Sequence, residues 1–435
     1  MFQRGNQNGE GTIIFDPMTN RDISTSVVII GAGPAGVGTS MFLSIAGIPH
    51  VILEKETFPR DKVCGDGISG KSAHVIRSAN PEWLQEIFRQ PETHTPSNGI
   101  IFAAPNGKQL TIPYGEQLKP GELAAGFTSP RLAFDNFLFS KIDHKHATVY
   151  QDAKVDSIEN TAAGPVVHFQ QNGTTFTLNA PLLIGADGDK GMTRKALGHE
   201  KVAAASYTVG VRGYYTGVTG MHERNYIELH FLDEMLPGYF WIFPLSNGMA
   251  NVGAAIEAET VKRRKINLRE LMLKTIKSND TIRRRFEGAS LMGKIQGCAL
   301  PLAMHRKPIS GNNYMLTGDA TSLIDPFSGE GIGNALYSGM LAAKAAEAAL
   351  EKDRYDQDFL KEAYDDVLYK RLGGEMKISA TLLKLCKYPW LFNFVVNKAH
   401  KSPELRKTIS CMFTDIDLRD QLRKPSFYAK ILLNK

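Results

Sequence analysis

Hydrophobic residues run without a break through Val27–Ile30, and such a β-branched run is typical of a strand buried on both faces. Apolar residues then recur with helical spacing to about residue 46, and a second apolar run ends in Glu54. Between the first strand and the helix stand glycines at the spacing GxGxxG. They are Gly31, Gly33 and Gly36. The pattern predicts a strand–helix–strand unit with a glycine-rich first turn.

Each part of this unit has a physical task in binding a dinucleotide. The first glycine allows a tight turn, the second lets a pyrophosphate approach the backbone, and the third lets helix and strand touch. The helix N-terminus offers partial positive charge to the phosphates. Glu54 would accept hydrogen bonds from ribose hydroxyls. A glycine-rich turn without function is the alternative, but strand, helix, second strand and acid together favour a dinucleotide site.

Two distant segments distinguish the dinucleotides. Residues 180–198 form an apolar strand that ends in Asp187, and residues 313–350 form another that ends in Asp319. A glycine-rich turn then enters an alanine-rich helix near Gly331 and Ile332. A nicotinamide domain does not need the later segment, whereas a flavin does. Asp319 would bind a ribityl hydroxyl, and the helix N-terminus would face the flavin pyrimidine edge. We therefore predict FAD as the cofactor.

The remaining patterns suggest how the chain is divided. Residues 147–178 read as a three-strand meander with Ala153 in its first strand, and "QQNG" as a hairpin turn. We predict an α/β (α+β) fold with a Rossmann-like FAD-binding domain, an antiparallel substrate sheet and a helical C-terminal region. The predicted parts are a polar tail (1–22), the FAD-binding domain (23–90, 122–198 and 292–355), the substrate domain (91–121 and 199–291) and C-terminal helices (356–435), interrupted at Pro389, Pro403 and Pro425.

The segment "PGYFWIFPLSNGMANVG", residues 237–253, is rich in aromatic residues. Strand period two places Tyr239, Trp241 and Phe243 on one face and Phe240 and Ile242 on the other. A sheet buried on both faces would explain these residues, because aromatic side chains are common in cores. Beside a flavin they would instead form the wall of an apolar substrate channel. We predict the second arrangement.

Two further segments carry charge near the predicted cofactor. The loop "FPRDKVCGDGISG", residues 58–70, places Cys64 and Asp66 among glycines, and we expect Arg60 and Lys62 to lower the thiol pKa towards neutrality. A cysteine that serves only for packing is the alternative. In residues 129–139, Arg131 lies on a helical face either as an exposed residue over a core face or against the FAD.

Composition narrows the classes of protein. The chain has 435 residues, a net charge of +6 and 43% hydrophobic residues, as in an ordinary soluble protein, and no run of eighteen apolar residues. The start lacks the pattern of an export signal, so we expect a cytoplasmic protein. The scattered cysteines suggest neither a metal nor an iron–sulfur site. The mild positive charge does not indicate nucleic acid.

The positive charge is concentrated between residues 262 and 285, where ten cations stand against two acids. A solvated helix face is the simpler interpretation. A surface that approaches anionic lipid headgroups is the alternative, and it matters only if the substrate lies in a membrane.

The chain resembles the geranylgeranyl reductase family of flavoproteins, within the para-hydroxybenzoate-hydroxylase-like fold, over roughly residues 25–400. The motifs that carry the resemblance are GAGPAG with Glu54, "CGDGIS", "YFWIFP" and "GDATSLIDPFSGEGIGNAL". Members often read Cys-Gly-Gly-Gly or Cys-Ala-Glu-Gly where Asp66 stands here. The resemblance implies reduction of carbon–carbon double bonds in prenyl chains. It also implies FAD contacts from Ala35, Glu54, Cys64, Gly65, Gly67, Arg131, Ala153, Asp319, Gly331 and Ile332.

Other activities share parts of these motifs. Flavin halogenases carry a WxWxIP strand, from which "YFWIFP" departs at its first and fifth positions, and they need a lysine near the substrate; aromatic monooxygenases share the fold. An electron carrier to a quinone would need a cysteine-rich cluster domain, and a non-catalytic lipid-binding flavoprotein is a further alternative. We predict the reductase, with either Cys64 or Asp66 as proton donor. The electron donor is either NAD(P)H or a ferredoxin.

Overall fold

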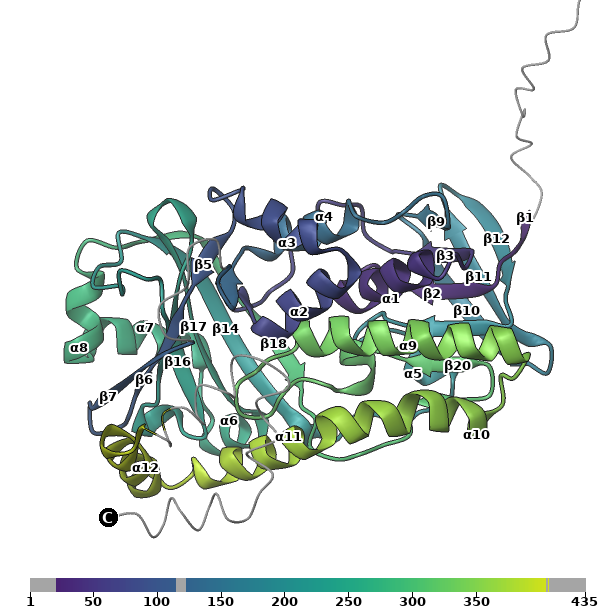
Figure 1. The fold of residues 1–435 in the computed structure, drawn as a ribbon. Helices are drawn as coiled ribbons and strands as arrows, with labels where there is room; N and C mark the ends of the chain where they lie inside the picture. The colour runs from purple at the N-terminus through teal and green to yellow at the C-terminus, as the bar shows by residue number, and fades with distance from the viewer. Residues whose placement is uncertain (1–20, 115–122, 404–405, 407–435) are drawn as a thin grey trace, which may run out of the picture.

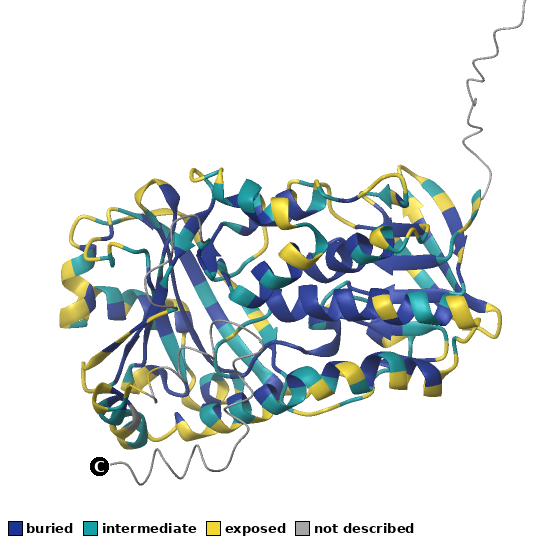
Figure 2. Ribbon diagram, viewed as in Figure 1, coloured by how far each residue is buried: buried dark blue, intermediate teal, exposed yellow. Residues whose placement is uncertain are grey.

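The computed structural model describes residues 21–114, 123–403 and 406. The predicted tail up to residue 20, residues 115–122 of the predicted substrate domain, Cys411 and Pro425 lie outside these residues. The molecule is elongated, with a nucleotide-binding part at one end and a large antiparallel sheet at the other, and long helices run beneath both (Figure 1). Buried residues fill both parts and the seam between them (Figure 2).

The nucleotide-binding part is built on a six-stranded sheet of order β19-β20-β13-β2-β3-β9, in which only β19 is antiparallel to its neighbour. The strands are β2 (Val27–Ile30), β3 (His50–Leu53), β9 (Ala147–Tyr150), β13 (Leu182–Gly185), β19 (Ser310–Gly311) and β20 (Tyr314–Leu316). Helices α1 (Pro34–Ile45) and α9 (Ile332–Lys352) pack against each other on one face. The apolar runs form central strands because helices and a second sheet cover them. The strands bring Glu54, Asp187 and Asp319 to one edge.

A four-stranded sheet of order β1-β12-β11-β10 covers the other face. Its strands are β1 (Arg21–Ser24), β10 (Lys154–Thr161), β11 (Gly164–Gln171) and β12 (Thr174–Asn179). The predicted meander and its Asn172–Gly173 turn are present, with positive φ at both turn residues. The first predicted strand is wrong in one respect, because the chain leaves the parallel sheet at Tyr150 and Ala153 precedes β10 instead of lying within a strand. Arg21 and Asp22, predicted as tail, belong to β1.

The second part is a seven-stranded sheet of order β18-β14-β17-β16-β15-β6-β7, mostly antiparallel. The strands are β6 (Gly99–Ala103), β7 (Gln109–Pro113), β14 (Tyr207–Thr216), β15 (Ile227–His230), β16 (Gly238–Pro244), β17 (Met249–Glu257) and β18 (Ser290–Pro301). One face packs on helices α6 (Ala258–Arg264), α7 (Leu268–Ser278) and α8 (Asp280–Arg283). The predicted boundary assigned residues 292–301 to the FAD-binding domain. They belong to this sheet instead, because β18 pairs along β14.

A small sheet joins the two parts, with order β4-β8-β5. Its strands are β4 (Gly67–Ile68), β5 (Thr95–Ser97) and β8 (Gly126–Thr128), and the neighbouring helices are α2 (Gly70–Ala79), α3 (Pro81–Phe88), α4 (Arg131–Phe139) and α5 (Thr193–Ala196). Short 3₁₀ turns occur at Ala204–Ser206, Asp233–Met235, Ser246–Gly248, Arg284–Phe286 and Gly318–Thr321. The loop with Cys64 leads directly into β4, so this small sheet holds the loop between the two parts.

The described part of the C-terminal region, up to residue 403, is helical, as predicted. It comprises α10 (Gln357–Leu360), a π turn (Lys361–Asp365), α11 (Asp366–Leu385) and α12 (Pro389–Lys401). The helices are interrupted before Pro389, as predicted. Pro389 is the first residue of α12, where a first-turn position needs no N–H donor. In the described ranges 21–114 and 123–403, no helix is long and apolar enough to cross a bilayer.

Candidate functional site: a dinucleotide cleft joined to an aromatic pocket

A cleft of about 620 Å³ opens at the carboxyl ends of the parallel strands, within the size range of small-molecule sites. Ten of the predicted cofactor residues line it: Gly31, Gly33, Ala35, Glu54, Arg131, Ala153, Asp187, Asp319, Gly331 and Ile332. Gly36 lies behind the cleft, where a Cβ would stand 1.8 Å from the carbonyl oxygen of Gly31. Its task is therefore the close approach of helix and turn, as the motif predicts.

The first turn and α1 leave room and charge for a pyrophosphate. Gly31 has a φ of +100°, and a Cβ there would stand 2.5 Å from the oxygen of Ala186. A Cβ on Gly33 would meet only Arg60 Nη2, at 3.7 Å. The helix N-terminus carries no side-chain cap and no acid in its first turn. An uncapped helix start facing open space is suited to a phosphate, so the residues present fit FAD.

The three acids of the cleft are held differently. Glu54 is buried, and its carboxylate accepts hydrogen bonds from the N–H groups of Ala32 (2.6 Å) and Glu56 (2.9 Å). Asp187 accepts from both N–H and hydroxyl of Thr193 at the start of α5, and burial raises its pKa. Asp319 is paired with Lys62 at 3.4 Å. Glu54 and Asp187 therefore organise their own turns, and their contacts with the cofactor remain predictions.

A second pocket, of about 190 Å³, continues from the cleft over Arg131, Asp319, Gly331 and Ile332. We call it the aromatic pocket. Tyr239, Trp241 and Phe243 line it, while Phe240 and Ile242 pack on the opposite face against α7. The predicted alternation along β16 is thus present, and the three rings face the pocket that adjoins the cleft.

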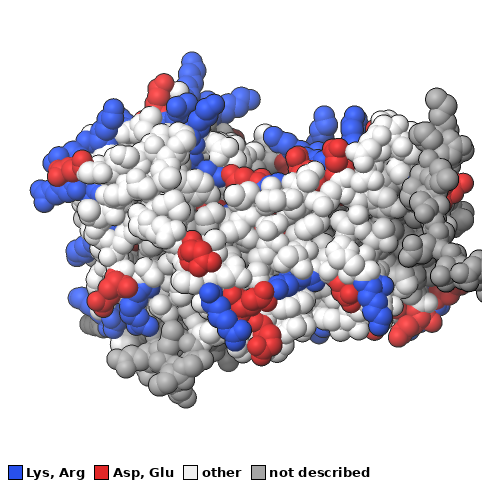
Figure 3. Space-filling model, turned by 90° about the horizontal axis from the view of Figure 1, so that it is seen from above, with Lys and Arg blue, Asp and Glu red and all other residues white. Residues whose placement is uncertain are grey.

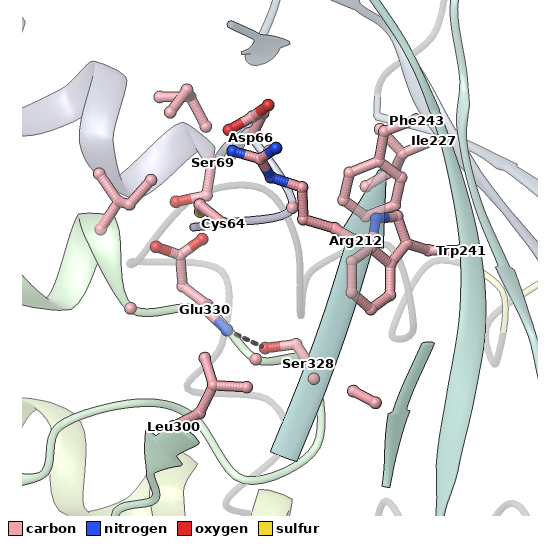
Figure 4. Close-up of a pocket in the computed structure, with 18 of the residues that line it drawn as sticks. Cys64, Asp66, Ser69, Arg212, Ile227, Trp241, Phe243, Leu300, Ser328 and Glu330 are labelled. Atoms are coloured by element: carbon pink, nitrogen blue, oxygen red, sulfur yellow. Dashed lines mark hydrogen bonds between the residues drawn. The ribbon is translucent and has the colours of Figure 1, made fainter. Parts of the chain in front are cut away.

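The Cys64 loop stands across from this wall (Figure 4). A Cβ on Gly67 would come within 3.2 Å of the ring of Phe243, and one on Gly65 within 3.4 Å of the same ring. Glycine at these positions therefore lets the loop approach the aromatic residues closely. Contact of Gly65 and Gly67 with FAD remains a prediction.

The predicted effect on the thiol of Cys64 is wrong. Burial raises its pKa above the ordinary value, although Arg131 lies near enough to oppose this. The expected cations face elsewhere, because Arg60 binds Asp135 at 2.6 Å and Lys62 binds Asp319. The thiol accordingly stays protonated near neutral pH.

Arg131, at the start of α4, is buried and not exposed. Its guanidinium donates two hydrogen bonds to Asp135, of 2.6 and 2.7 Å, and the same carboxylate binds Arg60. The side chain lines both the cleft and the aromatic pocket. The excess positive charge of this trio faces the region where the prediction placed the cofactor.

Asp66 is the acid that the structure singles out in the aromatic pocket. It is fully buried with a φ of +64°, and its Oδ2 accepts hydrogen bonds from Tyr214 Oη (2.7 Å) and Asn251 Nδ2 (2.8 Å). Its Oδ1 is buried without a hydrogen-bond partner. Burial is the largest influence and raises the pKa to about 6, against the opposing effect of these donors and of Arg212. A carboxyl group in this setting can give up a proton near neutral pH.

Sequence reasoning missed three side chains around Asp66. Asn251 donates to Asp66 and to the carbonyl oxygen of Cys64 (2.8 Å), and it accepts from Trp241 Nε1 (2.9 Å). Arg212 stacks over the ring of Tyr214 at 4.2 Å. The available signal was Arg212, the single charged residue of β14, two positions from Tyr214, because this spacing puts both side chains on one face.

The comparisons with known proteins agree with this geometry. The sequence matches the family described as "FAD binding domain" over residues 24–359, and the chain belongs to that family. It is 30% identical to the menaquinone reductase of Mycobacterium tuberculosis over 354 residues, 78% of this chain and 82% of the relative. It is 25% identical to the digeranylgeranylglycerophospholipid reductase of Methanosarcina mazei over 370 residues, 83% and 84% of the two chains.

Two solved structures show the same fold. A geranylgeranyl bacteriochlorophyll reductase-like protein from Thermoplasma acidophilum has a TM-score of 0.77 at 19% identity, covering 92% of this chain and 99% of that one. A flavin-dependent brominase has a TM-score of 0.74 at 20% identity, covering 94% and 99%. The predicted fold class, cofactor and family resemblance are confirmed. The chain is an FAD-dependent oxidoreductase with geranylgeranyl-reductase-like relatives.

Proposed function

We propose that this protein saturates carbon–carbon double bonds in the prenyl chain of an apolar lipid. The observation that carries the proposal is the aromatic pocket, in which an apolar wall and a buried carboxyl group of raised pKa face each other beside the cofactor cleft. The names of the relatives support it, because digeranylgeranyl denotes prenyl chains and menaquinone is a quinone with a prenyl tail.

The residues that line the cleft would hold the cofactor. The N-terminus of α1 would bind the pyrophosphate, Glu54 a ribose and Asp319 the ribityl chain, while the start of α9 would face the flavin ring. The chemistry that bound FAD, once reduced by NAD(P)H or a ferredoxin, would supply is a hydride for one carbon of the alkene. The other carbon then needs a proton, since an isolated alkene becomes saturated by one hydride and one proton.

We assign this proton to Asp66 rather than to Cys64. A carboxyl group with a pKa of about 6 is protonated in a useful fraction near neutral pH and gives up its proton readily. The buried thiol stays protonated, but its raised pKa makes it a weaker acid and so a poorer proton donor. The unpartnered Oδ1 of Asp66 is the atom left to carry the proton, because Oδ2 already accepts two hydrogen bonds. Solvent restores the proton after each turnover. Cys64 then packs beside Arg131 and shapes the loop.

The test is a single turnover without oxygen. The photoreduced protein is mixed with a geranylgeranyl lipid, extracted and analysed by mass spectrometry. We expect one double bond saturated per oxidised flavin. With a prenylated quinone, the gain of two hydrogens should survive reoxidation in air, whereas reduction of the quinone ring would be reversed. A lipid recovered unchanged, or changed only in its ring, would contradict the proposal.

Halogenation or oxygenation is the second candidate, favoured by the fold likeness to the brominase. Lys62 lines the pocket, but it pairs with Asp319, and the buried Lys71 donates to Asn334 at 2.6 Å. The same protein supplied with oxygen, bromide and an aromatic substrate distinguishes the activities. An oxygenated or brominated product, with no saturated lipid in the anaerobic reaction, would favour this candidate.

A further inference from the structure

The end of α11 and the start of α12 expose an unusual group of apolar side chains at the lower end of the molecule (Figures 1 and 2). Trp390 is 68% exposed, Tyr388 55%, and Leu385 and Phe394 40% each. We call these four residues the aromatic corner. Trp390 and Phe394 are one helical turn apart and share a face. The opposite face of α12 is buried through Val396 and Ala399, so the helix is already anchored without the aromatic corner.

The charged side chains along this part of the chain are all basic. From residue 376 to residue 403 the chain holds five lysines and neither aspartate nor glutamate. Lys384 and Lys401 are exposed, and Lys398 lies over the ring of Phe394 at 5.8 Å. Lys387 is also exposed, but it pairs with Glu257 at 2.9 Å. Tryptophan and tyrosine with flanking lysines are the residues enriched where proteins meet the headgroup region of a bilayer.

An apolar path connects the aromatic corner with the aromatic pocket. A small cavity of about 30 Å³ shares Tyr239, Ala255, Leu300 and Gly329 with the aromatic pocket. Leu383 of α11 and Cys386, the residue after that helix, also line it. Aromatic rings continue the path to α12, because Phe392 packs on Phe231 at 4.2 Å and Phe231 on Tyr239 at 5.8 Å. The end of α11 and the start of α12 thus expose apolar residues to the outside and contact the neighbourhood of the aromatic pocket on the inside.

We infer that the aromatic corner docks on an anionic lipid bilayer and that a lipid tail enters the aromatic pocket past Leu383 and Cys386. The second half of this inference rests on the proposed function, because only an apolar chain would use such a path. Exposed rings insert among the lipid tails, and the lysines bind the anionic headgroups. Docking at this corner brings the pocket to the membrane that holds the substrate.

The basic segment 262–285 is the competing surface. Lys and Arg side chains gather at the end of the molecule that carries α7 and α8 (Figure 3). Within this fully described segment no large apolar side chain is exposed, and Arg285 is tied to the buried carboxylate of Glu228. This surface has charge without the apolar side chains that insertion requires, so we assign docking to the aromatic corner.

Flotation of the FAD-loaded, full-length protein with vesicles tests the docking. The vesicles contain equal parts of phosphatidylcholine and phosphatidylglycerol, or phosphatidylcholine alone. The test variant is Trp390→Ser with Phe394→Ser, and a matched control, Ile45→Ser with Leu132→Ser, removes two exposed apolar side chains elsewhere. We expect the test variant to lose about tenfold or more in vesicle binding, the control none, and binding to weaken without phosphatidylglycerol.

Wild-type binding by the test variant would overturn the docking surface. So would a loss of binding in a charge variant of the competing surface, Lys262→Ser with Arg264→Ser, that matches or exceeds the loss in the test variant. Binding that arises only after deletion of residues 407–435 would show that the chain's own end occupies the corner, and would also overturn it. If light scattering shows a dimer for the wild type and a monomer for the test variant, the aromatic corner is an interface between two copies of the chain, which would also overturn the docking.

Failure of docking and failure of the proposed function give different results. With a short prenyl alcohol in solution, the test variant should turn over like the wild type, and with the same chain in vesicles its rate should fall about tenfold, in line with binding. Vesicle binding without any saturation would keep the docking and reject the function. Equal loss of turnover on both substrates would reject the entry path.

Discussion

The two halves of the site differ in what forms them. In the dinucleotide cleft the main chain does most of the work, through glycine turns and two helix starts that leave space and positive charge. In the aromatic pocket side chains from separate segments form the site. The rings of β16, Tyr214 and Asn251 come from one sheet, and Asp66 comes from the Cys64 loop. A main-chain site should fail abruptly when a Cβ is added, whereas a side-chain site should lose one property at a time.

The largest expected effect comes from the main-chain half. In Gly36→Ala the new Cβ would overlap the carbonyl oxygen of Gly31, so the turn must distort, and we expect the protein to purify without FAD and with reduced stability. In Gly33→Ala the Cβ overlaps no protein atom, because the nearest is Arg60 Nη2 at 3.7 Å. That variant should keep the melting temperature of the cofactor-free protein and still lose FAD.

Absorbance at the flavin maximum and thermal unfolding of both cofactor-free variants measure this difference. Stoichiometric FAD in Gly33→Ala would show that the pyrophosphate does not lie against α1. Equal loss of stability in both variants would contradict the assignment of Gly36 to packing and of Gly33 to pyrophosphate binding.

The next effect concerns the stability of the side-chain half. The pKa of Asp66 is raised from 3.8 to about 6 in the folded protein, so the folded state holds the proton more tightly than the unfolded chain. Below pH 4 this tighter proton binding stabilises the folded state by about 3 kcal/mol. The stabilisation is lost as the pH rises from about 4 to about 6 and the carboxyl group ionises. In Asp66→Asn the side chain cannot ionise, so this loss of stability with pH is absent. Asparagine also adopts the positive φ of this position readily.

We expect the unfolding free energy of Asp66→Asn, relative to the wild type, to increase between pH 4 and pH 7 by about this amount. Urea unfolding of cofactor-free protein at several pH values measures it. A difference that stays constant with pH would contradict the raised pKa.

The smallest effect is on ligand binding at the aromatic wall. Trp241→Ala removes much of the apolar surface opposite the Cys64 loop, and we expect prenyl binding to weaken about tenfold, for a loss of roughly 50 Å² of apolar contact. The flavin spectrum should not change. Trp241→Phe keeps an apolar ring and loses only the hydrogen bond to Asn251, so it should bind nearly as well as the wild type. Titration by quenching of flavin fluorescence compares the two variants. Wild-type affinity in Trp241→Ala would show that this ring does not contact the ligand.

The cofactor half could be predicted from the sequence because its signals are local. A strand, its glycines and the acid that follows are neighbours in the chain, so Glu54, Asp319 and the start of α9 were recognisable. The alternation along β16 is also local, and it gave the correct faces for Tyr239 and Trp241.

The partners of the side-chain half are not local. Tyr214 is 148 residues from Asp66 and Asn251 is 185, and only the pairing of β14, β17 and β16 brings them together. The expected low thiol pKa of Cys64 failed for the same reason. Arg60 binds Asp135, which is 75 residues away, and desolvation of the thiol cannot be judged from neighbours in sequence.

The central claim is that Asp66 protonates the alkene while the main-chain half holds the cofactor. Single-turnover reoxidation of the photoreduced protein by a geranylgeranyl substrate, without oxygen and across pH, tests it most directly. The wild-type rate should fall about tenfold per pH unit above the Asp66 pKa of about 6, because the donor must be protonated. Asp66→Asn should keep FAD and react about a hundredfold or more slowly at every pH, while Cys64→Ala, the matched control, should keep most of the rate. Wild-type turnover by Asp66→Asn, with a loss in Cys64→Ala instead, would contradict the account.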